Sequence, residues 1–75
     1  MAEFGKEYIV SPENVGATMR KARIDAGYTQ LDVAALMVID QSAICVYEAG
    51  KREPGVTFLN RFCKAVGCYI VIPPY

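Results

Sequence analysis

Residues 29–50 read TQLDVAALMVIDQSAICVYEAG, and the fold depends on this stretch. Thr29 is a favourable N-cap residue, and Asp32 stands three residues later as a weaker form of the capping box. We therefore expect a helix to begin here. Its apolar side is expected to consist of Val33, Ala34, Leu36 and Met37.

A second helix is predicted after a short turn. Asp40 is interpreted as its N-cap, Ala49 as its last residue and Gly50 as the residue that ends it. Ile44 and Tyr47 are expected to face inward. Two helices joined by a turn of about three or four residues must pack at a steep angle, and this is the helix-turn-helix arrangement.

Helical patterns also lie on both sides of this pair. Upstream, Ser11 can cap a helix, Pro12 suits its first position, and Glu13 favours the positive end of its dipole. The apolar positions and terminal glycine of this helix are Val15, Met19, Ala22, Ala26 and Gly27. Those of the downstream helix, after a loop closed by Pro54, are Val56, Leu59, Phe62, Cys63, Val66 and Gly67.

Two short runs rich in β-branched and aromatic residues frame the helices, at Lys6–Val10 (KEYIV) and Cys68–Ile72 (CYIVI). The predicted fold class is mainly α, with four to five helices and short N- and C-terminal strands. We expect an N-terminal arm or strand at 1–10, a helical domain at 11–67 and a C-terminal strand at 68–75. The helix-turn-helix itself is placed at about residues 29–49.

The composition narrows the classes of function. A chain of 75 residues with 53% hydrophobic and 21% charged side chains can form one packed domain. It has no His, so we expect neither the usual zinc sites nor imidazole-based catalysis, and no enzyme activity, metal or cofactor. The three cysteines lack CxxC spacing and are interpreted as buried or half-buried small apolar residues in a reducing compartment. Without a signal peptide or an apolar run of ~20 residues, we expect a cytoplasmic protein with no membrane partner.

The charge pattern is less informative. The formal net charge is +0, which argues against strong nonspecific affinity for nucleic acid. Basic side chains nevertheless gather at Arg20–Arg23 and at Lys51–Arg52. Acidic residues in the same stretch dilute them, so charge alone does not indicate DNA binding.

A spaced set of residues between Met19 and Gly67 carries a family resemblance. Its members are Arg20, Arg23, Ala26, Gly27, Thr29, Gln30, Val33, Ala34, Leu36, Ser42, Ile44, Tyr47, Glu48, Gly50, Pro54, Leu59, Ala65 and Gly67. In this spacing the chain resembles a Cro/CI-type (Xre-family) helix-turn-helix domain. The resemblance implies a lambda-repressor-like fold. It also implies a sequence-specific transcriptional regulator that binds double-stranded operator DNA as a homodimer, with a recognition helix from about Gln41 in the major groove.

The resemblance assigns the reading of DNA bases to Gln41, Ser42, Cys45 and Val46. They are the outward positions if Ile44 and Tyr47 point inward. A Gln side chain can bond two atoms of adenine, and Val methyl groups can contact the thymine methyl group. From the residues alone, Gln41 and Ser42 fit better as solvated residues at a helix start.

Contacts to phosphates are assigned to Thr29, Gln30, Lys51 and Arg52. The first turn of a helix attracts phosphate through its N–H groups and its dipole. An ordinary exposed Gln and a solvated basic loop are the simpler alternatives. The resemblance also pairs Arg23 with Glu48 as a partly buried, structural ion pair that ties the recognition helix to the scaffold.

Three positions depart from the family pattern. Val38 stands where the turn often holds Gly, so the turn either avoids positive φ or is strained. Cys45 and Val46 replace residues that are usually more polar. The face expected to read DNA is therefore unusually apolar.

The flanks are similar to those of HipB-type antitoxins, in the approach from Tyr8 to Pro12, in Met19 and in a single strand after the last helix. That similarity implies a dimer strand at Tyr69, Ile70, Val71 and Ile72, paired with its copy in a second subunit. Pairing with residues 8–10 of the same chain is the alternative. Two other functions stay open: an antitoxin that autoregulates and binds a partner toxin, and a protein-interaction module that has lost DNA binding.

Overall fold

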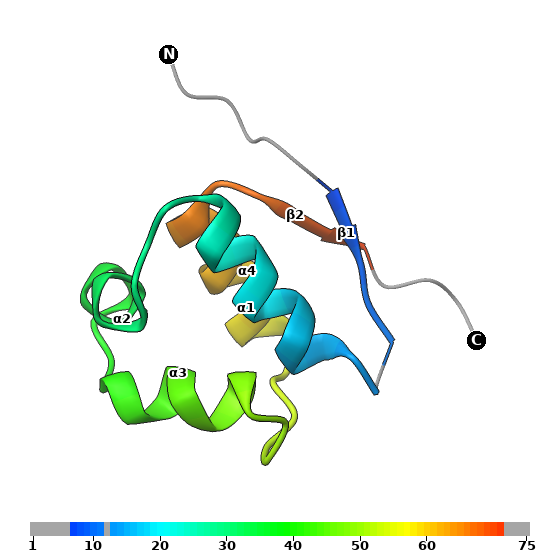
Figure 1. Ribbon diagram of the computed structural model, residues 1–75, viewed down its shortest axis with the longest axis horizontal. Coiled ribbons are helices and arrows are strands. Elements are labelled where there is room, and N and C mark those ends of the chain that lie inside the picture. Colours follow the sequence, from blue (N-terminus) through cyan, green and yellow to red (C-terminus); the bar gives the residue numbers. More distant parts are fainter. Residues whose placement is uncertain (1–6, 12, 72–75) are drawn as a thin grey trace.

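The structure, a computed structural model, describes residues 7–11 and 13–71, in which two short strands flank four helices (Figure 1). In chain order the elements are β1 (Glu7–Ile9), α1 (Val15–Asp25), α2 (Gln30–Met37), α3 (Gln41–Glu48), α4 (Val56–Val66) and β2 (Tyr69–Val71). The predicted fold class, mainly α with short strands at both ends, is confirmed. The predictions made for Lys6, Pro12 and Ile72 fall outside the described residues.

The first helix begins later than its sequence pattern predicts. Asn14, rather than Ser11, occupies the N-cap position of α1. The backbone N–H of Ser11 donates to Asn14 Oδ1 at 2.7 Å, and the N–H of Asn14 donates to the Ser11 carbonyl at 3.1 Å. This local side-chain bond forms a turn that competes with the helix, so the prediction of a helix start at Ser11 was wrong.

All four helices end in the same way. The residue after each helix, or one position further on, takes a left-handed conformation, and the next N–H returns to a carbonyl five residues earlier. These bonds are Tyr28 N to Arg23 O, Ile39 N to Ala34 O, Lys51 N to Val46 O and Cys68 N to Cys63 O, at 3.0–3.1 Å. Three of the left-handed residues are the glycines predicted to end helices, Gly27, Gly50 and Gly67.

The fourth left-handed residue is Val38, at φ 58° and ψ 52°. A β-branched residue is strained in this region because its side chain crowds the backbone. Of the two possibilities that the sequence left open for this turn, the structure therefore has the strained one. The side chain of Val38 is 87% exposed, so packing within the domain returns little for this strain.

The core lies where the four helices meet. Its largest fully buried side chains are Met19, Val33, Ile44 and Phe62. Leu36 and Val56, which were predicted to face the core, are 52% and 64% exposed, and Ala26 is exposed as well. Leu36 lies outside the arc of α2 that the three buried residues of this helix span, and Val56 lies at the very start of α4.

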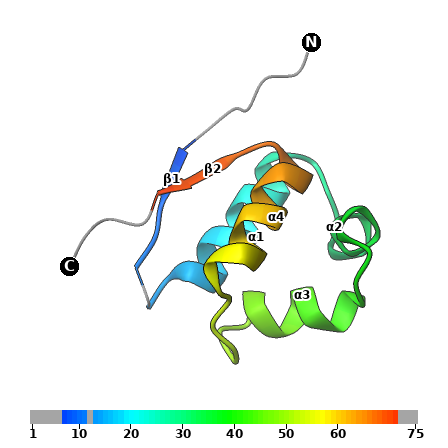
Figure 2. The ribbon, with the colours of Figure 1, turned by 180° about the vertical axis from the view of Figure 1, so that it is seen from behind.

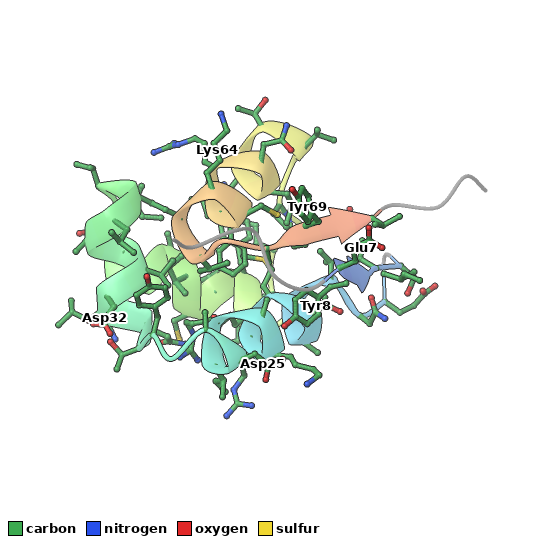
Figure 3. The ribbon with its side chains drawn as sticks, turned by 90° about the horizontal axis from the view of Figure 1, so that it is seen from above. Glu7, Tyr8, Asp25, Asp32, Lys64 and Tyr69 are labelled. Carbon is green, nitrogen blue, oxygen red and sulfur yellow. The ribbon has the colours of Figure 1, made fainter. Side chains whose placement is uncertain are left out.

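The two strands pair with each other in parallel, with Glu7 opposite Tyr69 and Ile9 opposite Val71. Tyr8 and Ile70 pack against the core, and the alternate residues point outward. From β1, Tyr8 donates its hydroxyl hydrogen to Asp25 of α1 at 2.7 Å (Figure 3). Burial and then this bond raise the pKa of Tyr8 to about 12. Pairing within the chain, the alternative noted from the sequence, is thus the arrangement in a single chain.

Candidate nucleic-acid interface

The candidate interface is built on α2 and α3, between which the chain bends by 119°. That angle is typical of a helix-turn-helix. Both views of the ribbon place α3 at the end of the molecule away from the two-stranded sheet (Figures 1 and 2). Within residues 7–11 and 13–71, no single helix is long and apolar enough to cross a membrane. Only α2 and α3 taken together have the required length and hydropathy, and the chain is bent between them.

One side of α3 is exposed and the other is packed. Ile44 is fully buried, and the half-buried ring of Tyr47 lies 4.4 Å from that of Phe58, measured between ring centroids. The four residues predicted to read bases lie on the outer side: Gln41, Ser42 and Cys45 are exposed, and Val46 is half-buried. The helix therefore presents the expected residues on one accessible face.

A shallow hollow of about 310 Å³ joins part of this face to the loop after α3. Ser42 and Val46 line it together with Arg52, which the sequence assigned to a phosphate. Asp40 also lines it, and sequence reasoning missed this role. Its side chain forms no cap hydrogen bond, although its backbone occupies the predicted N-cap position. A carboxylate here repels phosphates and can accept a hydrogen bond from the amino group of cytosine.

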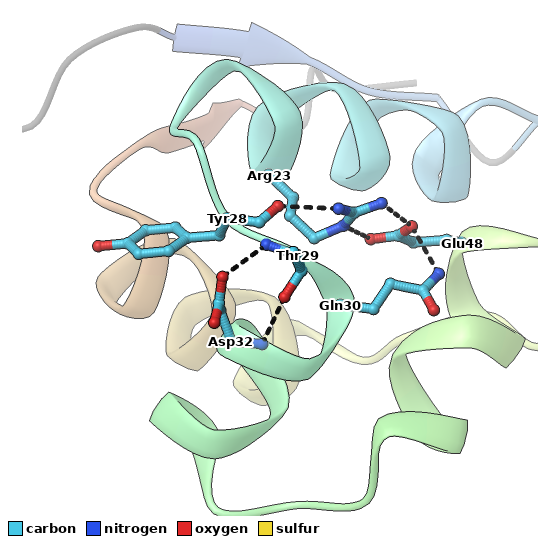
Figure 4. Close-up of polar contacts among 6 residues, drawn as sticks. All are labelled: Arg23, Tyr28, Thr29, Gln30, Asp32 and Glu48. Carbon is cyan, nitrogen blue, oxygen red and sulfur yellow. Dashed lines mark hydrogen bonds and ion pairs between the residues drawn. The ribbon is translucent and has the colours of Figure 1, made fainter.

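The orientation of α3 is fixed by a buried ion pair to α1 (Figure 4). Arg23 Nε lies 2.7 Å from Glu48 Oε2, and Arg23 Nη2 donates to Glu48 Oε1 at 3.0 Å. Arg23 Nη1 also donates to the Tyr28 carbonyl at 2.9 Å. The exposed fractions of the Arg23 and Glu48 side chains are only 10% and 3%. The hydrogen bonding to Glu48 raises the pKa of Arg23 above its ordinary value.

The start of α2 is joined to the same network. Gln30 Nε2 donates to Glu48 Oε1 at 3.1 Å, so its side chain is engaged within the protein (Figure 4). Sequence reasoning missed this contact because no local pattern links two residues so far apart in the chain. Arg23, Glu48 and Gln30 together connect α1, α2 and α3.

Thr29 is engaged in the predicted capping box, which is confirmed. Its hydroxyl accepts the N–H of Asp32 at 3.0 Å, and its own N–H donates to Asp32 Oδ2 at 2.8 Å. The bond from the Thr29 backbone N–H, and then the Thr29 hydroxyl, lower the pKa of the Asp32 carboxylate. Because both side chains are engaged within the protein, an anion at the start of α2 would be bound mainly by the backbone N–H groups and the helix dipole.

The remaining predicted residues lie in two separate regions. Lys51 and Arg52 are exposed directly after α3. Tyr69, Ile70 and Val71 lie on β2, at the end of the molecule away from α3 (Figure 1). The interpretation of the cysteines as buried residues holds for Cys63 and Cys68 and was wrong for Cys45, which is an exposed free thiol.

Comparison with known proteins gives a family match over most of the chain. The helix-turn-helix family matches residues 19–72. An uncharacterized HTH-type transcriptional regulator from Archaeoglobus fulgidus is 41% identical over 58 residues, which make up 77% of this chain and 25% of that protein. The chain thus spans about a quarter of the length of this relative.

Solved structures have the same fold. The clp gene regulator ClgR from C. glutamicum aligns with a TM-score of 0.72 and 28% identity, over 76% of this chain and 74% of that chain. The restriction-modification controller protein C.AhdI from Aeromonas hydrophila gives 0.67 and 24%, over 73% and 83%. A variant of C.Esp1396I, bound to its highest affinity operator site, gives 0.66 and 25%, over 73% and 72%. These likenesses agree with the lambda-repressor-like fold expected from the sequence.

Proposed function

Because the chain belongs to the Xre-type helix-turn-helix family, we propose that it binds double-stranded DNA with α3 in the major groove and thereby regulates transcription. The observation that carries this proposal is the exposed first turn of α3 on a helix whose orientation a buried ion pair fixes. A major groove admits one helix, and side chains on the first turn of such a helix reach the base edges. The operator complex of the structurally similar C.Esp1396I variant supports the same use of the fold.

We assign base reading to Gln41, Ser42, Cys45 and Val46. Gln41 is exposed at the first position of α3 and is suited to adenine, whose N6 and N7 it can bond together. Cys45 and Val46 add apolar contact, which favours thymine through its methyl group. The proposed site therefore prefers A·T pairs opposite the centre of α3.

Phosphate binding is assigned to both ends of the helix pair. Lys51 and Arg52 follow α3 as exposed cations, and the N-terminus of α2 offers backbone N–H groups and the positive end of its dipole. The net charge of +0 gives the chain no overall attraction for DNA, because its acidic side chains offset the other basic ones. The proposal therefore predicts a modest number of phosphate contacts in each subunit.

The salt dependence of binding tests this assignment. Affinity for DNA from the region upstream of the gene is measured by gel shift over a salt series. Each lost phosphate contact lowers the slope of log affinity against log salt by about 0.9. Lys51→Ala and Arg52→Ala should each lower it by about that amount, and Lys64→Ala on α4 should not. Absence of salt-sensitive binding to any such DNA would contradict the proposed function.

A homodimer is part of the proposal, since two half-sites multiply a modest affinity. The outer face of the two-stranded sheet supports it. Ile9 is 70% exposed, Tyr69 51% and Val71 39%, and together they form an apolar surface at the end away from α3. Sedimentation of Ile9→Lys with Val71→Lys tests this face. Both side chains point away from the core, so the variant should fold but sediment as a monomer, and an unchanged dimer would rule this face out.

A further inference from the structure

Val38 lies in the turn between α2 and α3, and the stability of the fold does not explain why a valine occupies this position. The other three helices end with a glycine in the same left-handed conformation, at φ 75° to 85°. Here a β-branched residue takes that conformation and remains 87% exposed. Strained residues that the fold does not require are found where a side chain has another use. An exposed apolar side chain is most useful in contact with another molecule.

Val38 also lines a groove between the end of α2 and α4. The groove has a volume of about 460 Å³ and is lined by Leu36, Met37, Val38, Arg61, Lys64 and Ala65. Its apolar wall includes the exposed Leu36, 52% accessible, so two large aliphatic side chains stand unpacked beside each other. This volume suits a few side chains of a bound segment.

The other wall of the groove is cationic. Arg61 is held at the end of α2 by a hydrogen bond from its Nη2 to the Met37 carbonyl, at 2.7 Å. Lys64 is exposed one turn further along α4. It lies on the opposite side of the molecule from Asp25 of α1 (Figure 3). Among the described residues that line this groove, none carries a negative charge. The groove therefore matches a ligand that is apolar on one side and anionic on the other.

We propose that this groove binds an acidic, amphipathic segment of another protein. Apolar side chains of that segment would pack on Leu36 and Val38, and a carboxylate would pair with Arg61 and Lys64. The apolar wall favours a peptide over nucleic acid, because large apolar side chains of a peptide can cover Val38, whereas a DNA backbone presents mainly charged phosphates and polar sugars. The site is separate from the outer face of α3, so it does not depend on DNA binding.

Phage-displayed random peptides, panned on the intact chain, test the proposal. The enriched peptides should combine acidic residues with large apolar ones. Their affinity, measured by fluorescence anisotropy, should fall about tenfold in Val38→Gly, because the variant loses an apolar side chain that binding buries. It should fall further in Arg61→Glu with Lys64→Glu. The matched control, Arg20→Glu with Lys21→Glu on α1, should bind as the original chain does.

Three results would overturn the proposal. Enriched peptides could be basic or lack acidic residues, or their binding could be the same in all these variants. The charge reversal on α4 could instead lower affinity for operator DNA, which would assign the groove to the DNA interface. Because Val38→Gly relieves strain, lost peptide binding in that variant cannot be attributed to unfolding, and its thermal melt provides the check.

Discussion

Replacing Val38 by glycine should stabilise the domain, although it removes an apolar side chain. The left-handed conformation costs an L-residue about 1–2 kcal/mol, and a β-branched residue lies at the upper end of that range. Against this gain, glycine lowers the stability by about 0.4–1 kcal/mol, because it increases the conformational freedom of the unfolded chain. Because Val38 is 87% exposed, the burial lost is only about 0.3 kcal/mol. The net expectation is a gain of about 1 kcal/mol in the free energy of unfolding.

Equilibrium unfolding in urea, followed by circular dichroism, measures this gain. The midpoint should rise with an unchanged slope, and the melting temperature should rise by about 4–8 °C for a domain of this size. Val56→Gly is the matched control, since Val56 is an exposed valine in a helix with ordinary φ. That control should lose stability, by about 0.5–1 kcal/mol. If Val38→Gly is no more stable than the original chain, the argument from strain is refuted.

Three further predictions concern the scaffold. Arg23→Met should cost about 3–5 kcal/mol because it leaves Glu48 buried without its partner, whereas the double change of Arg23→Met with Glu48→Leu should cost less; a double-mutant cycle in urea that gives additive losses would contradict the buried pair. Gly16→Ala should lower the free energy of unfolding by about 1–3 kcal/mol in the same assay, because its Cβ would collide with a carbonyl oxygen at the end of α3. Gly55→Ala is the control: no atom lies within 4 Å of its added Cβ, so the free energy of unfolding should change little. Because the pKa of Asp32 is lowered, its contribution to stability is present above the ordinary carboxyl pKa of about 4 and is lost as pH falls through the lowered value. Asp32→Asn should flatten this part of the pH profile of stability. An unchanged profile would argue against the cap.

The elements that local chemistry determines could be predicted from the sequence. The Thr29–Asp32 capping box and the terminal glycines Gly27, Gly50 and Gly67 act within a few residues, and the structure has them where the pattern places them. The start of α1 was misplaced because Asn14, which is as good a cap as Ser11, was not considered, and its side chain forms the turn before the helix.

Contacts between distant segments were much less accessible. The pairing of Arg23 with Glu48 came from the family resemblance and not from spacing. The bonds from Gln30 to Glu48 and from Arg61 to the Met37 carbonyl have no sequence signal, because they depend on how the helices dock. The exposure of Leu36 has the same cause, since periodicity identifies an apolar residue but not which part of α2 the neighbouring helices cover.

The central claim, that the first turn of α3 reads DNA bases, is tested most directly by the specificity of Gln41→Ala. Affinity is measured for the operator and for a scrambled duplex at one salt concentration, with Asn60→Ala on α4 as the matched control. The account predicts that Gln41→Ala binds the operator about 10–100-fold more weakly, while binding to the scrambled duplex is unchanged. Asn60→Ala should behave as the original chain does. Equal operator affinity in Gln41→Ala and the original chain would contradict the account.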